Sequence, residues 1–242
     1  MQAIQYYLES TYLKTDYKSG SKFLQNFILE AIENDFKLVM IRPEIVSFAR
    51  KLIDNNKSQT LVGTVIDFPL GNGTLEDKIA QANIAMKNGA DELDFVINYE
   101  AFKSGHVALV KQQVLKCTEL CLLNNKTAKW IIEIAALTNT EIKNICLLIR
   151  DTIVSNFEES DYNNVFVKSS TGFFKTQNNL PNGATKDGIS IMVENGSPLL
   201  VKASGGVRSL EDVQAMIELG VSRIGTSSAL NILKGKSNNT DY

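Results

Sequence analysis

Lys168 ends a short apolar run, Val165-Phe166-Val167, and small polar residues and glycine follow it at once in Ser169-Ser170-Thr171-Gly172. A β-branched and aromatic run of this length predicts a buried strand, and the change to serine and glycine predicts that the strand ends there. A lysine at such a point is poorly solvated, and burial disfavours the ammonium form of an amine. A free amine can attack a carbonyl, so this stretch predicts Schiff-base chemistry.

The same pattern recurs 34 positions later in Val201-Lys202-Ala203-Ser204-Gly205-Gly206. This spacing fits one strand, helix and strand unit, so both lysines are expected at the same end of neighbouring parallel strands. The charge of Lys202 would then disfavour the ammonium form of Lys168. The spacing leaves open which lysine is the nucleophile. The alternative is that each lysine only extends its amine from a strand end into water, and two matching lysines weaken that alternative.

Asp94 lies in a predicted strand between Leu93 and Phe95, whose side chains point to the opposite face. If those two pack against helices, Asp94 points inward, where a carboxylate needs a cationic partner such as the two lysines. Two roles stay open for Asp94, proton transfer at a carbon next to an imine or a counter-ion only. Asp91 and Glu92 begin the strand and are expected to be solvated.

Two glycine-containing segments follow the last lysine strand and the final predicted strand. Loops at these places in a barrel often bind phosphate through backbone amides and a helix N-terminus. Glycine lets the backbone approach an anion, while arginine and serine side chains add donors. Ordinary tight turns are the alternative. The predicted phosphate-binding residues are Gly205, Gly206, Arg208, Gly225, Ser227 and Ser228.

Strand-like and helix-like segments alternate about eight times along the chain, and the strands are short and apolar on both faces. This pattern predicts an α/β fold, a closed (β/α)₈ TIM barrel of residues 1–242 as one domain, with an N-terminal extension and a flexible tail at 235–242. An open doubly wound sheet is the alternative, although no Gly-x-Gly-x-x-Gly lies between a strand and a helix. The predicted strands include 6–9, 38–41, 60–66, 92–97, 130–134, 165–168 and 221–225, and the predicted helices include 23–32, 107–123, 186–194 and 209–219.

Composition excludes several classes of function. The chain is 44% hydrophobic and 21% charged, as in ordinary globular proteins, and its net charge of −2 argues against nucleic-acid or acidic-membrane partners. No signal pattern or membrane-spanning run is evident, so we expect a cytoplasmic protein. A single histidine, His106, in a polar turn argues against Ser-His catalysis or a histidine-rich metal site. Cys117, Cys121 and Cys146 are expected to be buried apolar side chains.

Four segments together resemble the deoxyribose-phosphate aldolase family of class I aldolases. They are Gly63 to Gly71, Ala90 to Asn98, Phe166 to Gly172 and Val201 to Arg208. The resemblance implies a TIM barrel in which Lys168 forms a Schiff base with acetaldehyde, and Asp94 and Lys202 relay protons. It also implies that glyceraldehyde 3-phosphate adds to the enamine to give 2-deoxyribose 5-phosphate, reversibly and without a metal or cofactor. Gly172 joins the predicted phosphate-binding residues on this basis.

The chain departs from the family pattern at several positions. Glu9 stands in the first strand where members commonly have an aspartate, which bears on hydroxyl recognition. Phe173 follows Gly172 where many members carry a lysine near the phosphate, and Lys175 is a candidate to compensate. Met40 replaces a cysteine of some members, with little chemical consequence. Tyr242 is a candidate accessory residue, because a C-terminal tyrosine assists proton transfer in some members.

Two other functions remain as alternatives. One is a Schiff-base barrel aldolase that acts on a different sugar phosphate, and the other is a catalytically silent barrel that binds a sugar phosphate. The small-molecule partners expected are a sugar phosphate and an aldehyde, and a homodimer is one expected assembly.

Overall fold

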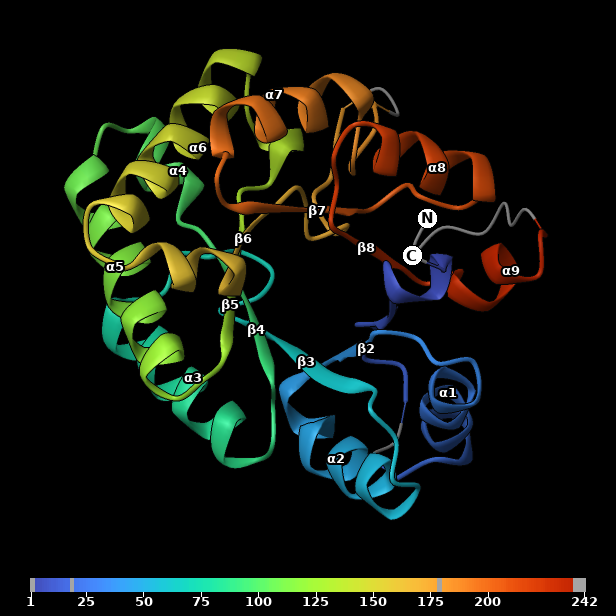
Figure 1. The fold of residues 1–242 in the computed structure, drawn as a ribbon. Helices are drawn as coiled ribbons and strands as arrows, with labels where there is room; N and C mark the ends of the chain where they lie inside the picture. The colour runs from blue at the N-terminus through green and yellow to red at the C-terminus, as the bar shows by residue number, and fades with distance from the viewer. Residues whose placement is uncertain (1–2, 18–19, 178–179, 237–242) are drawn as a thin grey trace.

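The computed structural model describes residues 3–17, 20–177 and 180–236, and its centre is a closed barrel of parallel strands surrounded by helices (Figure 1). The strands follow one another around the barrel in chain order, and β1 pairs with both β2 and β8. This closure excludes the open sheet and confirms the predicted TIM barrel. The strands are β1 (Leu8–Tyr12), β2 (Leu38–Ile41), β3 (Leu61–Ile66), β4 (Glu92–Val96), β5 (Thr127–Ile131), β6 (Val165–Lys168), β7 (Leu200–Ser204) and β8 (Arg223–Thr226).

The helices form the outer layer of the barrel (Figure 1). They are α1 (Lys22–Glu33), α2 (Val46–Asn55), α3 (Leu75–Lys87), α4 (Tyr99–Lys103), α5 (Val107–Leu123), α6 (Asn139–Val154), α7 (Lys186–Gly196), α8 (Leu210–Glu218) and α9 (Ala229–Leu233). Short 3₁₀ turns lie at Ile4–Tyr6, Pro43–Ile45, Ile134–Ala136 and Glu159–Asn164. Within the described residues, no helix has both the length and the apolar character needed to cross a bilayer.

Local sequence explains where several helices begin. Thr74, Thr138 and Ser209 each accept a backbone N–H with the side chain, while an acid three residues later accepts the N–H of the capping residue. These capping boxes satisfy amides that have no partner within the helix and place acidic charge at the positive end of the helix dipole. The capping residues thus fix where helices α3, α6 and α8 begin.

The interior of the barrel is apolar on one side and charged on the other. Outward-facing strand residues pack against the helices, as where Trp130 stacks on Phe95 at 5.1 Å between ring centroids. Inward-facing residues of β2 and β3, among them Leu38, Met40 and Val65, form a separate apolar cluster. Met40 therefore has a packing role. On β4, β5 and β7 the inward side chains are charged instead, which creates a polar region inside the barrel.

Three predictions of secondary structure differ most from the structure. The first strand begins at Leu8 and extends to Tyr12, because residues 4–6 form a 3₁₀ turn rather than an extended segment. The fifth strand is 127–131 rather than 130–134, since Glu133 has a left-handed backbone with φ of 56° that ends the extended run. Helices α4 and α9 have five residues each and were not predicted, because one helical turn gives little periodic signal.

Candidate active site

Lys168 and Lys202 are directly opposite each other on neighbouring strands, in the β6–β7 register. Both amines donate to the same carboxylate oxygen, Asp94 Oδ2, at 2.8 Å from Lys168 Nζ and 2.7 Å from Lys202 Nζ. Leu93 and Phe95 pack in the outer layer, so Asp94 points inward as the alternation predicted. The structure thus brings together all three residues that the sequence predicted as catalytic.

The charge of Asp94 is set by opposing effects. Burial raises the pKa of its carboxyl, but the ammonium groups of Lys168, Lys202 and Lys129 outweigh burial and hold the pKa well below its usual range. Asp94 is therefore a carboxylate at neutral pH, and it accepts hydrogen bonds from both amines.

Lys202 is the deeper of the two amines and has no exposed surface. Burial lowers its pKa to about 8, and the charges of Lys129 and Lys168 act in the same direction, while Asp94 and Glu9 oppose the shift. Repulsion between the two lysines therefore contributes to a lowered pKa at Lys202. An amine with a pKa this close to neutrality can exchange protons with a reacting group at physiological pH.

A cluster of buried charges, called the ionic cluster below, adjoins the two lysines. Lys129 Nζ lies 2.6 Å from Glu9 Oε1 and also pairs with Glu92, and the other oxygen of Glu9 accepts from Lys202. Arg223 lies 3.2 Å from Glu92 and 3.5 Å from Glu9. With Asp94 and Lys168 included, three carboxylates face four basic groups.

Glu9 lies inside the ionic cluster rather than at the barrel mouth. Burial raises the pKa of its carboxyl, but Lys129 and Lys202 reverse this and bring it to about 2. Its two oxygens contact Lys129 and Lys202, so the direct effect of Glu9 is to stabilise the charges of these two lysines. The prediction that Glu92 is solvated was wrong, because its side chain is buried between Lys129 and Arg223. Asp91 is half-buried and pairs with Arg50.

The serine residues after each lysine explain why the two strand ends share a sequence pattern. Ser169 Oγ donates to the Ser204 carbonyl at 3.0 Å, and the Ser204 N–H donates back to Ser169 Oγ at 2.9 Å. Ser204 Oγ in turn donates to the Ser170 carbonyl at 2.6 Å. This reciprocal pairing fixes the ends of β6 and β7 against each other and so fixes the two lysines.

Three glycines meet where the segments after β6 and β7 approach each other. Gly172 and Gly205 have φ of 81° and 79°, which favours glycine. A Cβ added to Gly183 would lie 2.2 Å from the Gly205 carbonyl carbon, so only glycine permits this approach. Gly206 also has a positive φ, and the Arg208 N–H donates to Asp212 at 2.9 Å.

The segment after β8 lies beside the segment after β7. Thr226 Oγ1 donates to the Val207 carbonyl at 2.8 Å and accepts the N–H of Ser228 at 3.0 Å. Ser227 and Ser228 therefore follow a residue that contacts Val207, the residue directly after Gly205-Gly206. Gly225 lies within β8, where an added Cβ would be 3.2 Å from Lys202 Cε. Its first role is to leave room for the Lys202 side chain.

Phe173 extends from the end of β6 to the apolar side of the barrel. Its ring packs edge-to-face on Phe68 at 5.1 Å between centroids, and the Arg42 guanidinium lies 5.0 Å from the Phe68 centroid. Lys175 lines a cavity of about 300 Å³ with Glu133 and Thr171. The residues that line this cavity do not include those of the Gly205 or Ser227 segments.

Glu133, Lys129 and Arg223 are site residues that the sequence reasoning missed. Lys129 and Glu133 alternate with outward-facing Trp130 and Ile132, the same signal that pointed to Asp94. Of the remaining predictions, His106 is exposed at the start of α5, and the three cysteines are buried, as expected. Tyr242 lies outside the described residues.

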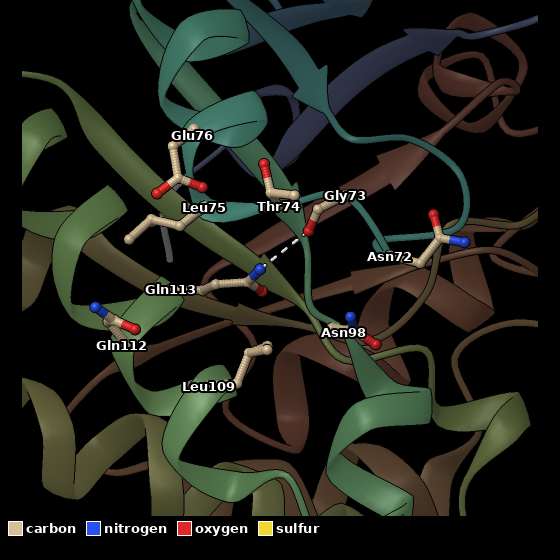
Figure 2. Close-up of a pocket in the computed structure, with 9 residues that line it drawn as sticks. All are labelled: Asn72, Gly73, Thr74, Leu75, Glu76, Asn98, Leu109, Gln112 and Gln113. Carbon is tan, nitrogen blue, oxygen red and sulfur yellow. Dashed lines mark hydrogen bonds between the residues drawn. The ribbon is translucent and has the colours of Figure 1, made fainter.

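A second cavity, of about 290 Å³, lies between the start of α3 and α5, outside the ionic cluster (Figure 2). Figure 2 shows Gln113 extending from α5 to the segment before α3, where its Nε2 donates to the Gly73 carbonyl at 3.0 Å. This bond holds the segment that carries Phe68 against the outer helical layer.

Comparisons with known proteins agree with this geometry. Residues 11–235 match the model of the DeoC/LacD family aldolase. A deoxyribose-phosphate aldolase from Streptococcus pneumoniae is 38% identical over 237 residues, which is 98% of each chain. One from Metamycoplasma hominis is 38% identical over 221 residues, or 91% of this chain and 92% of the relative.

Solved structures give the same result. An aldolase designated QR15 superposes with a TM-score of 0.82 at 30% identity, covering 97% of this chain and 96% of that one. The tetrameric deoxyribose phosphate aldolase from Aeropyrum pernix superposes with a TM-score of 0.78 at 25% identity, covering 96% and 89%. The family match and the identity to these relatives agree with the barrel and its paired lysines. We conclude that the chain belongs to the DeoC/LacD family of aldolases.

Proposed function

We propose that this chain is a Schiff-base aldolase that reversibly cleaves 2-deoxy-D-ribose 5-phosphate to acetaldehyde and D-glyceraldehyde 3-phosphate. The observation that carries the proposal is the pair of buried lysines that share one oxygen of Asp94. The names of the relatives support the substrate. The functional unit is the one barrel domain of residues 1–242.

Lys168 is the proposed nucleophile. Its amine donates to the single carboxylate Asp94, whereas the Lys202 amine lies between the carboxylates of Asp94 and Glu9. Lys168 therefore breaks fewer ion pairs than Lys202 would when its amine turns toward a substrate carbonyl. Lys202 and Asp94 remain in contact with each other and can move protons beside the reacting amine.

In the cleavage direction, the Lys168 amine adds to the C1 aldehyde and loses water to give an iminium. The iminium draws electrons from the C2–C3 bond as a base removes the proton of the C3 hydroxyl. That bond breaks, glyceraldehyde 3-phosphate leaves, and an enamine of acetaldehyde remains on Lys168. Protonation at C2 and hydrolysis release acetaldehyde and restore the amine. Asp94 and Lys202 are the proposed proton carriers in these steps.

The phosphate site is proposed at the joined segments after β6, β7 and β8. The backbone can approach the phosphate closely at Gly172, Gly205, Gly206 and Ser228. Side-chain donors come from Arg208 and Ser227. The contact of Thr226 with Val207 supports this assignment, because it holds two of the three segments together. Gly225 contributes indirectly, through the room it leaves for Lys202.

Borohydride reduction in the presence of acetaldehyde tests the nucleophile. The expected result is a mass increase of one reduced acetaldehyde adduct at Lys168, absent from Lys168→Leu, and no cleavage of deoxyribose 5-phosphate by that variant. Modification confined to other lysines would overturn the assignment. A parallel panel with dihydroxyacetone and pyruvate separates this activity from an aldolase with another donor, and turnover itself separates it from a silent binding barrel.

We propose that the chain forms a homodimer. We also propose that it is located in the cytoplasm. A solved relative is tetrameric, which supports self-association in this family. Light scattering of the purified chain measures the assembly, and a mass of one chain at micromolar concentration would contradict it.

A further inference from the structure

Glu133 follows the end of β5 and lies beside the segment that ends the Lys168 strand. The N–H groups of its two neighbours, Ile132 and Ile134, donate to the carbonyls of Lys168 and Ser169, each at 2.9 Å. Between these bonds the Glu133 backbone is left-handed, with φ of 56° and ψ of 66°. For a residue other than glycine this conformation costs free energy, so the surrounding contacts impose it.

The carboxylate of Glu133 holds one residue, Thr171. Its Oε2 accepts the N–H of Thr171 at 3.2 Å and also the hydroxyl of Thr171. The Thr171 oxygen itself accepts the N–H of Phe173 at 3.0 Å, so its own proton is directed to Glu133. Three hydrogen bonds thus shape the turn from Thr171 through Gly172 to Phe173.

The Glu133 carboxylate is buried away from water. Glu133 is 1% exposed, and among the described residues its Oε1 has no hydrogen-bond partner. Glu133 and Thr171 line the same cavity of about 300 Å³ next to Phe173. The titratable and charged groups that face Glu133 are Lys168, whose charge stabilises the carboxylate, Tyr99, and Lys175 in the cavity wall.

The two sides of the segment after Lys168 are therefore held differently. On the β7 side, Ser204 bonds to Ser169 and to the Ser170 carbonyl. On the β5 side, Glu133 holds Thr171 through its side chain. Loss of the carboxylate would free Thr171 and Gly172 but leave Lys168 in its strand.

We propose that Glu133 is a positioning residue for the acceptor half of the reaction, because it holds the Thr171-Gly172-Phe173 turn in the form that receives the phosphorylated aldehyde. This inference rests on the proposed function. It predicts that Glu133 governs binding of the phosphorylated substrate while the reaction of Lys168 with acetaldehyde stays intact.

The test compares Glu133→Gln and Glu133→Gly at pH 8, because burial raises the pKa of Glu133 to about 7 and the carboxylate is ionised there. Glu133→Gly removes the carboxylate and relieves the left-handed backbone, so it keeps the fold accessible. For both variants, KM for deoxyribose 5-phosphate should rise about tenfold or more, as expected for lost charge-assisted hydrogen bonds. Borohydride trapping of acetaldehyde at Lys168 should stay within about twofold, since the hydrogen bond of Lys168 to Asp94 is kept.

Glu141→Gln is the matched control. Glu141 accepts the N–H and the hydroxyl of Thr138 at 2.7 and 2.9 Å, the same pattern as Glu133 with Thr171, but in an exposed capping box. Its KM should match the parent. Thr171→Val should reproduce the Glu133→Gln effect, Thr171→Ser should not, and the double variant Glu133→Gln/Thr171→Val should be no worse than either single variant.

Amide hydrogen exchange gives a readout without turnover. Exchange in the 169–174 peptide should accelerate about tenfold in Glu133→Gln and stay unchanged in Glu141→Gln. Unchanged exchange, additive effects in the double variant, or equal loss of acetaldehyde trapping and of substrate binding would each overturn the inference. A parent protein that traps no acetaldehyde would instead refute the proposed function, and the exchange result would still decide the role of Glu133.

Discussion

Lys168 and Lys202 are paired in register across β6 and β7, and both amines donate to Asp94 Oδ2, at 2.8 and 2.7 Å. One carboxylate oxygen thus serves two amines. The two amines are thus bridged by a single shared acceptor. This arrangement suits a reaction in which one lysine must lose a proton before it attacks and another group must return one later.

Asp94→Asn removes the shared charge and keeps the shape. A neutral amide cannot stabilise two ammonium groups or carry a proton between them, so turnover of deoxyribose 5-phosphate should fall about 100-fold or more. Steady-state kinetics measure this fall. Asp151→Asn is the control, because Asp151 is an exposed carboxylate paired with Arg150, and its kcat should match the parent. A turnover number for Asp94→Asn close to that of the parent would contradict proton transfer through Asp94.

Lys202→Met should change how stability depends on pH. The pKa of Lys202 is lowered from 10.5 to about 8 in the folded chain. Between pH 8 and 10.5 the unfolded chain therefore binds a proton that the folded chain does not, so stability rises with pH by up to about 3 kcal/mol from this group. The free energy of unfolding of the parent relative to Lys202→Met should increase from pH 8 to pH 10 in urea titrations. Parallel curves for the two proteins would contradict the lowered pKa.

Lys129→Met should destabilise the fold strongly. It leaves Glu9 and Glu92 buried without their shared ammonium, and breaking a buried ion pair in this way costs about 3–5 kcal/mol. Lys116→Met breaks an exposed pair with Glu119 and should cost about 1 kcal/mol or less. Urea unfolding at pH 7 measures both. Equal losses for the two variants would mean that the ionic cluster contributes no more than a surface pair.

Gly183→Ala should disturb the proposed phosphate site but not the lysines. The new Cβ would lie 2.2 Å from the Gly205 carbonyl carbon and 2.3 Å from its oxygen, so the segments after β6 and β7 must separate. KM for deoxyribose 5-phosphate should rise at least about tenfold, while acetaldehyde trapping at Lys168 persists. Gly196→Ala is the control, because its nearest contact is an ordinary 3.6 Å to Val167. An unchanged KM for Gly183→Ala would place the phosphate elsewhere.

The sequence predicted those parts of the site that depend on one strand at a time. Lys168 and Lys202 end apolar runs, and Asp94 alternates with two large apolar residues, so local patterns suffice to place them. The same local patterns predicted the closed barrel and most of its helices. Strand ends were less well predicted where a polar interior replaced apolar residues, as in β1, which begins Leu8-Glu9-Ser10.

The parts that the sequence did not predict depend on contacts across the barrel. Lys129 meets Glu9 from 120 positions away, and Arg223 meets Glu9 from 214 positions away. No pattern within one strand encodes such a partner. The left-handed backbone of Glu133 was equally hidden, since this conformation is uncommon for a glutamate and is imposed by the bonds of its neighbours to β6.

The ionic cluster also limits how this sequence can change over time. Each of its charges contacts opposite charges on other strands, so a single change of charge removes an ion pair from every one of its buried partners. A neutralising change at Glu92 becomes acceptable when Arg223 is neutralised as well, because both groups then lose their charge together. Among descendants of this chain, we therefore expect the interior positions of β1, β4, β5 and β8 to covary, with substitutions in correlated pairs.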